Sequence, residues 1–322
     1  MEDGHLTAPC HEPSAVAAGD DRELIIWRGS QYSVKALAAL HLKGFARPSV
    51  DYRLSVAPLD FKSRRVLLPA PHTVPVLRWD GEVITGTNVC AFLDSRFPGE
   101  AALYPEGCAD EVRRLEGECA VIYWLNGWLS FVDPDGFERY AGALARRHID
   151  SGGAGAAAKV AGRLLPRRVV GRVVNREVAK NFLKTMKVRG AEAGGAVGEV
   201  CERLAQMKVP SDIAKVFEEA RAMLLRLDEE LQRSSTPFFC GAAAPTAADL
   251  TLYGMLERWI GDGLCPARHG AAQPSIADGM SGVQAFWEAM RERFRPDLVL
   301  DDHKECNDVK SPVGPETWPS KS

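Results

Sequence analysis

The eight cysteines of this 322-residue chain include no C-x-x-C pair. A dithiol redox motif and a paired-cysteine zinc site are therefore both missing from the sequence. The cysteines are scattered from Cys10 to Cys306, which favours reduced thiols over a disulfide framework. Neither a G-x-S-x-G motif nor an internal repeat is present, so the pattern of a serine hydrolase is lacking as well.

Long apolar runs are also lacking. The longest, "VIYWLNGWLSFV" at 121–132, is too short to cross a bilayer as a helix. Residues 1–22 are polar and acidic and contain no apolar stretch typical of a signal peptide, so we expect a disordered N-terminal segment. These features predict a cytoplasmic protein.

A strong net charge is absent. The formal charge is −3, which gives no reason to expect nucleic acid as a partner. This mild acidity conceals a basic block from Lys159 to Arg189, with ten Lys or Arg and one Glu. Two interpretations stay open for the block: a surface for an anionic membrane or acidic partner, and a solvated face with no ligand.

The elements predicted for residues 23–100 describe a small α/β domain. They are a strand at 23–27, a helix at 31–44, a strand at 49–56, a hairpin at 73–86 that turns at Asp80-Gly81, and a helix at 87–98. The order βαβ–ββα predicts a mixed four-stranded sheet of the thioredoxin-like class.

The rest of the chain has the composition of an all-α domain. Its helices are predicted at 109–131, 136–148, 197–208, 211–233, 247–261 and 282–294. We therefore divide the chain into the N-terminal segment, an α/β domain, a helical domain at 101–295 with a basic insertion near 151–196, and an extended tail at 296–322.

Three motifs in this arrangement resemble the glutathione transferase superfamily. The first is Val74-Pro75 before the hairpin; in the superfamily this proline is cis, and the preceding residue offers its backbone to the cysteinyl part of glutathione. From the residues alone, a trans proline at a sheet edge is the alternative. If the resemblance holds, residues 23–100 form the glutathione-binding domain.

The second motif is "ITGTNVCAFLDSRFP" at 84–98. It resembles the stretch in which an acidic residue and a Ser or Thr at a helix start hold the γ-glutamyl group. Thr87 matches the hydroxyl position, either as a ligand contact or only as an N-cap. Gly86 stands where the acidic residue is usual, so the partner for the substrate's ammonium group is missing there.

The third motif, "PFFCGAAAPTAADLTLYGML" at 237–256, resembles the helix start "FLxGxxPSxADxxLY" of the superfamily. Thr246 and Asp249 are expected to form a capping box, a structural role.

Ser30 matches the catalytic hydroxyl of serine-type glutathione transferases of the tau and phi kind. The resemblance implies that this hydroxyl donates to the sulfur of glutathione and lowers the pKa of the thiol. The alternative is that Ser30 only caps the helix that starts at Gln31. Ser33 falls inside that helix, and neither serine can form a disulfide, which excludes glutaredoxin-like activity.

An electrophile pocket would lie between the two domains. Tyr123 and Trp124 on the 109–131 helix, together with Tyr32, are its candidate residues. Aromatic residues spaced at i, i+4, such as Trp124 and Trp128, are nevertheless more often core than pocket residues. The resemblance thus implies a cytosolic enzyme, possible as a homodimer, that conjugates glutathione as co-substrate to a small hydrophobic electrophile without a metal. The alternative function is a non-catalytic module of the same fold that uses its basic insertion to contact a partner or membrane surface.

Overall fold

The computed structural model describes 22–27, 30–46, 50–56, 68–69, 73–98, 101–132, 179–180, 182–188, 190–191, 193–207, 211–261 and 276–294. The predicted N-terminal segment, the helix at 136–148, most of the basic block and the tail from 296 lie outside these described residues.

Four short strands form one mixed sheet. They are β1 (Glu23–Ile26), β2 (Arg53–Val56), β3 (Val76–Trp79) and β4 (Glu82–Thr85), in the order β2-β1-β3-β4. The β1–β2 pair is parallel, whereas β3 runs antiparallel to both β1 and β4. Asp80 and Gly81 turn the hairpin with φ of 49° and 85°, the conformation that an Asp-Gly pair favours. The predicted thioredoxin-like sheet is confirmed.

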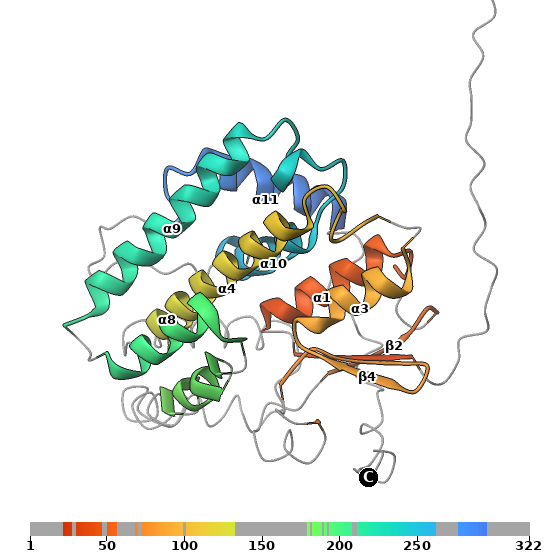
Figure 1. Ribbon diagram of the computed structural model, residues 1–322, viewed down its shortest axis with the longest axis horizontal. Coiled ribbons are helices and arrows are strands. Elements are labelled where there is room, and N and C mark those ends of the chain that lie inside the picture. Colours follow the sequence, from red (N-terminus) through yellow and green to blue (C-terminus); the bar gives the residue numbers. More distant parts are fainter. Residues whose placement is uncertain are drawn as a thin grey trace, which may run out of the picture.

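Two helices cover one face of this sheet, α1 (Gln31–Leu42) and α3 (Asn88–Arg96) (Figure 1). Every residue of β1 is buried, including Glu23, whose carboxylate pairs with Arg53 and Arg78. Ile25 and Val76 pack with Leu68 on the side of the sheet away from the main core. Gly44, with φ of 83°, follows α1 and confirms the predicted helix stop.

The second half is helical, as predicted. Its helices are α4 (Ala109–Phe131), α8 (Gly195–Gln206), α9 (Ile213–Arg233), α10 (Ala247–Leu256) and α11 (Ser281–Phe294), with short turns η1 (Phe239–Gly241) and η2 (Glu257–Gly261). The helix predicted at 247–261 is α10 continued by η2, a π-helical turn. None of the described helices is long and apolar enough to cross a membrane.

The two halves meet where α1 packs against α10, which in turn packs against α4. Gly254 of α10 makes this approach possible, because a Cβ atom there would lie 2.4 Å from the carbonyl oxygen of Gln31. The backbone of the first turn of α1 therefore packs directly against α10 of the helical domain.

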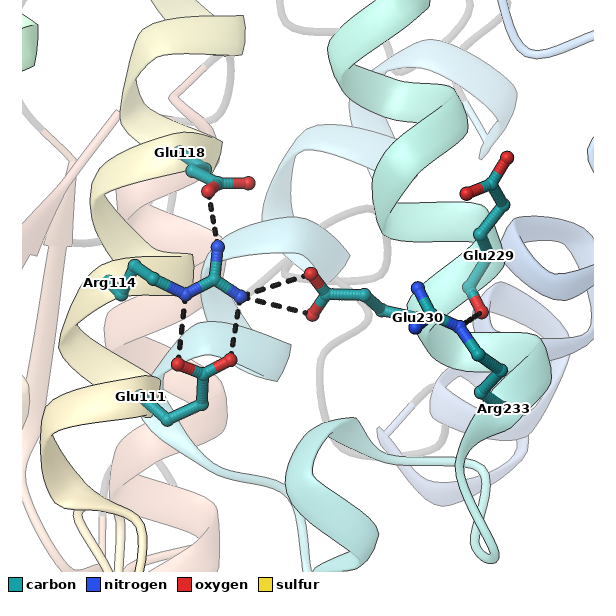
Figure 2. A network of polar contacts seen from close by, with 6 residues as sticks. All are labelled: Glu111, Arg114, Glu118, Glu229, Glu230 and Arg233. Carbon is teal, nitrogen blue, oxygen red and sulfur yellow. Dashed lines mark hydrogen bonds and ion pairs between the residues drawn. The ribbon is translucent and has the colours of Figure 1, made fainter.

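Figure 2 shows a network of ion pairs that joins α4 to α9 at the surface of the helical half. The guanidinium group of Arg114 donates to both carboxylate oxygens of Glu111, at 2.6 and 2.8 Å, and reaches Glu230 of α9 at 3.0 Å. Glu118 is a further acceptor. The side chain of Arg114 is 43% exposed, so solvent screens these ion pairs and lowers the contribution of each to stability.

A buried ion pair joins the α/β domain to α4. Lys35 of α1, with a side chain only 3% exposed, pairs with Glu116 of α4, whose second oxygen accepts from the hydroxyl of Tyr104 at 2.9 Å. Burial raises the pKa of the neighbouring Cys90 thiol to about 12 and also raises that of Cys119, so both thiols are neutral at pH 7. The charge of Lys35 is thus balanced by Glu116.

A second ion pair anchors the segment between the domains. Asp94 of α3 accepts from Lys43 at 2.8 Å and from the backbone N–H groups of Leu103 and Tyr104, at 2.8 and 3.1 Å. Lys43, with a side chain that is fully buried, also donates to the carbonyl oxygen of Phe97 at 3.0 Å. These bonds fix the segment that connects α3 to α4 both at the end of α3 and at Leu103 and Tyr104.

We expect Glu116→Ala to lower the free energy of unfolding by about 3–5 kcal/mol, because it leaves Lys35 buried without a counter-charge. Glu116→Gln keeps an oxygen for the Tyr104 hydroxyl and therefore isolates the effect of the charge. The double variant Lys35→Met with Glu116→Met removes both charges and should recover at least half of the lost free energy of unfolding. Denaturant unfolding of the wild type and the three variants measures these differences. A cost of Glu116→Ala below about 1 kcal/mol contradicts the charge-balancing role.

Candidate functional site

The register of the sheet brings the predicted site residues to one edge. Ile25 pairs with Val76 and Val76 pairs with Thr85, so the end of β1, the start of β3 and the end of β4 coincide. Trp27 directly follows β1, Val74 lies two residues before the start of β3, and Thr87 lies two residues after the end of β4, so all three lie at this end of the sheet. Ser30 follows three residues after Trp27, and the backbone bond from its N–H to the carbonyl oxygen of Trp27 (2.9 Å) keeps it at the same edge.

The Val74-Pro75 peptide bond is cis, as predicted. The carbonyl oxygen of Pro75 accepts from the N–H of Gly86 at 2.9 Å, which holds the start of β3 against the end of β4. Gly86 has φ of 60°, a conformation that suits glycine and turns the chain from β4 into α3. Val74, Pro75, Gly86 and Thr87 therefore lie together.

Ser30 caps α1. Its hydroxyl oxygen accepts from the N–H of Ser33 at 3.4 Å, and its own backbone is extended, with φ −95° and ψ 120°. A hydroxyl has one proton to donate besides its acceptor sites, so the capping bond leaves that proton for another group. The half-buried Ser30 can thus cap the helix and donate to a ligand at once.

Ser33, in contrast, has a structural role that the sequence does not reveal. It is fully buried, and its hydroxyl oxygen accepts from the N–H of Trp27 at 3.2 Å, across the connection between β1 and α1. This contact holds the turn that presents Ser30. Nothing in the local pattern distinguishes it from any serine in the first turn of a helix.

Thr87 precedes α3 but does not cap it. The residue is exposed, has helical φ and ψ angles and makes no side-chain capping bond, so the N-cap interpretation of its hydroxyl is not supported. The first turn of α3 contains no acidic side chain. The positive end of the helix dipole is therefore not neutralised by the helix itself and favours an anion.

A row of aromatic rings leads from α1 along α4. Tyr32 meets Tyr123 edge to face at 5.2 Å between centroids, Tyr123 contacts Trp124 at 4.8 Å, and Trp124 contacts Phe182 at 5.7 Å. Tyr32 and Tyr123 are half-buried, whereas Trp124 is 6% exposed and Trp128 fully buried. The tryptophans are therefore core residues, and the predicted electrophile pocket can only draw on the exposed parts of the tyrosines.

The sequence analysis missed Phe182, which belongs to the basic block. Its ring covers Gly127 of α4 so closely that a Cβ atom on Gly127 would lie 2.6 Å from it, and it contacts Phe131 at 5.2 Å. The only signal in the sequence was an aromatic residue among lysines, together with a glycine inside an apolar helix.

The capping box at the start of α10 is confirmed, and it does more than cap. Asp249 accepts from the backbone N–H of Thr246 at 2.7 Å, from the Thr246 hydroxyl at 2.6 Å, and from the N–H of Phe239 at 2.9 Å. The carboxylate is fully buried. It therefore fixes both the helix start and the preceding loop, ten residues away in sequence.

No group of three or more His, Cys, Asp or Glu side chains within the described residues is arranged to hold a metal ion. The chemistry available at the sheet edge is that of hydroxyl groups, backbone groups and two helix N-termini. Such groups can donate hydrogen bonds to an anion.

No protein-family model and no curated protein matches this chain. Solved structures with a similar chain trace include a glutathione S-transferase of Methylobacillus flagellatus with glutathione bound, at 16% identity, covering 86% of this chain and 98% of that one, with a TM-score of 0.45. A glutathione S-transferase of Ceriporiopsis subvermispora in complex with glutathione is 14% identical, covers 87% of this chain and 99% of its own, and has a TM-score of 0.47. Poplar glutathione transferase F1 is 12% identical, covers 87% of this chain and 97% of its own, and has a TM-score of 0.44.

Burial raises the pKa of Asp249 to about 6, against the opposing effect of its hydrogen bonds. The folded state therefore holds a proton at pH 5 that the unfolded state has released. This contribution to stability is complete below about pH 4 and is lost as the pH rises through about 6. The wild type should gain about 2–3 kcal/mol relative to Asp249→Asn, which cannot titrate, between pH 7 and pH 4.

Denaturant unfolding of both proteins across that pH range measures this difference. The comparison cancels the other carboxylates, which act equally in the two proteins. A difference that stays constant with pH shows that Asp249 remains ionised in the folded state.

Proposed function

We propose that this protein is a glutathione transferase of serine type, conjugating the glutathione thiolate to a small hydrophobic electrophile. The observation that carries the proposal is the convergence at one sheet edge of Ser30, the cis Val74-Pro75 bond and the exposed Thr87. Each of these residues was singled out from the sequence for a different part of the same ligand.

In this proposal the backbone of Val74 binds the cysteinyl part of glutathione, and the start of α3 binds a carboxylate. Unpaired N–H groups of the first helical turn attract an anion, and Thr87 adds a hydroxyl donor. Because Gly86 has no side chain, the ammonium group of glutathione has no carboxylate partner there. We expect weaker binding than in proteins with an acidic residue at that position.

Ser30 acts on the thiol in this scheme. Its hydroxyl proton donates to the sulfur and favours the thiolate over the thiol, and the N-terminus of α1 adds positive potential in the same direction. The thiol proton passes to solvent, the thiolate attacks the electrophilic carbon, and the leaving group departs with the electron pair of the broken bond. The enzyme itself forms no covalent bond.

The aromatic row gives the electrophile an apolar neighbour. Tyr32 follows Ser30 in the first turn of α1, and its ring meets that of Tyr123 edge to face. This placement favours an electrophile with a planar apolar group.

Ser30→Ala should lower turnover of glutathione with a chlorodinitrobenzene-type electrophile by roughly 10- to 1000-fold, because the thiolate loses its donor. Ser30→Thr keeps the hydroxyl and should retain most activity. Ser95→Ala, at an exposed position of α3, is the control. A pH profile shifted to higher pH in Ser30→Ala separates loss of thiolate from loss of folding, and unchanged rates remove Ser30 from the mechanism.

A second candidate function is a non-catalytic interaction module of the same fold. It is favoured by Gly86, which lacks the ammonium partner, and by Lys184 and Lys187, which are exposed on the helical residues 182–188 of the basic block. In this proposal the block contacts an anionic surface and the sheet edge is unused.

Retention on immobilised glutathione distinguishes the two candidates. The transferase is retained and turns over the electrophile, whereas the module does neither yet co-sediments with anionic liposomes. A chain in which the exposed Lys184 and Lys187 are both changed to Gln keeps Phe182 in place and should then lose liposome binding. Equal sedimentation of both chains rules out the surface contact.

A further inference from the structure

The helix α4 extends beyond the start of α1, the end at which Ser30 lies. Lys35 of α1 pairs with Glu116 of α4. Tyr32, about one turn nearer the start of α1, meets Tyr123, about two turns further along α4. The two helices are therefore antiparallel where they touch. Because α1 begins one residue before Tyr32, whereas α4 continues for about two turns after Tyr123, the second half of α4 extends past the first turn of α1.

Phe182 covers this part of α4. The face of α4 that meets α1 continues to Gly127, because residues four apart on a helix lie on the same side as each other. The ring of Phe182, from the helical residues 182–188 of the basic block, lies so close to this face that a Cβ atom on Gly127 would be 2.6 Å from the Cζ atom of the ring. Phe182 is thus the next aromatic ring along the face after Tyr123.

Three rings along this face keep part of their surface exposed. Tyr32, Tyr123 and Phe182 are each half-buried, whereas Trp124, which contacts both Tyr123 and Phe182, is 6% exposed. Met186, one turn after Phe182, is fully buried in the main core and anchors the segment. Phe182 therefore presents ring surface that an apolar ligand can contact, in line with the two tyrosines.

The position of the Phe182 ring is set by α4. Besides Gly127, the ring contacts Trp124 at 5.7 Å and Phe131 at 5.2 Å between centroids. Glycine inside a helix is less favourable than alanine, and at Gly127 the close approach of the ring is what excludes a Cβ atom. A change at Gly127 is thus expected to act by moving this ring.

We propose that Phe182 is a specificity-determining residue of the electrophile site: its ring closes the far end of the aromatic row and limits the length of the aromatic electrophile that reaches the thiolate near Ser30. The inference rests on the proposed function for the reaction and adds the residue that selects the substrate. A short aromatic electrophile fits between the tyrosines and Phe182, whereas a longer one meets the ring. Gly127 is a positioning residue, since it acts only through the space that it leaves for the ring.

The test compares two electrophiles that differ only in length, benzyl isothiocyanate and 6-phenylhexyl isothiocyanate. In both, the glutathione thiolate adds to the isothiocyanate carbon, one electron pair of the C=N bond moves to nitrogen, and nitrogen takes a proton from solvent, so nothing leaves. The wild type should have the higher kcat/KM for the benzyl compound. Phe182→Ala should lower this preference about 10-fold, because the end of the site is opened, and Phe182→Leu should give an intermediate value.

Two further variants separate the ring from its surroundings. Leu183→Ala shortens the neighbouring half-buried side chain of the same segment, which is not part of the aromatic row, and should keep the preference of the wild type. Gly127→Ala should change the preference in the wild type but not in Phe182→Ala, where no ring is left to move. A glycine needed only for the fold would act equally in both backgrounds. Thermal unfolding shows that each variant is folded.

An unchanged preference in folded Phe182→Ala and Phe182→Leu overturns the proposal and leaves the proposed function standing. An equal change in Leu183→Ala overturns it as well, because the effect then belongs to the segment as a whole and not to the ring.

Photolabelling with benzophenone tests the aromatic row without glutathione. Irradiated benzophenone inserts into neighbouring C–H bonds, and peptide mapping should place the label on α4 and on residues 182–188 in the wild type. The label on 182–188 should be lost in Phe182→Ala. If the wild type turns over neither isothiocyanate, the proposed function fails, and this labelling alone decides: label on the row supports the site that Phe182 closes, and label confined to other parts of the chain overturns it.

Discussion

The position of α1 depends on two buried lysines, Lys35 and Lys43, and on the carboxylates that balance their charges. Lys35 lies in the interface between the α/β domain and α4, and Glu116 is the group that balances it. The same carboxylate accepts from Tyr104, whose backbone is held by Asp94, which in turn neutralises Lys43. Two ion pairs and one linker residue thus fix α1, α3 and α4 relative to one another, and burial makes each partner costly to remove.

This constraint bears on the candidate site because α1 carries both the thiol-end residue and the first aromatic ring. Ser30 caps α1, and Tyr32 packs edge to face against Tyr123 of α4. The first turn of α1 packs so closely on Gly254 that a Cβ atom at this position has no room. The distance between the two domains is therefore set within a narrow range. The geometry at the sheet edge is therefore a property of the domain interface as much as of the sheet.

A second set of contacts, around Asp249, organises the opposite end of α10. Its carboxylate fixes the helix start and the loop that contains Cys240. The backbone bond between Ala247 and Leu103 then joins this loop to the segment before α4. The capping box follows from neighbouring residues, whereas the bonds of Asp249 to Phe239 and of Ala247 to Leu103 depend on the fold.

The sequence determined the features that depend on local chemistry. Apolar periodicity predicted both ends of α4, Asp80-Gly81 predicted the hairpin, and the spacing of Thr246 and Asp249 predicted the capping box. Each of these features involves residues within a few positions of one another. Val74, Pro75, Gly86 and Thr87 were also identified as candidates from their local motifs.

Only the tertiary structure decided which of these residues share a place. The register of β1, β3 and β4 brings the segments that hold Ser30, Val74 and Thr87 to the same end of the sheet. The structure also shows that the hydroxyl of Thr87 makes no capping bond to α3. The roles of Ser33 and Phe182 could not be found from the sequence. Their roles depend on partners that are distant along the chain or set by backbone geometry, and burial and pairing between such groups exist only once the chain has folded.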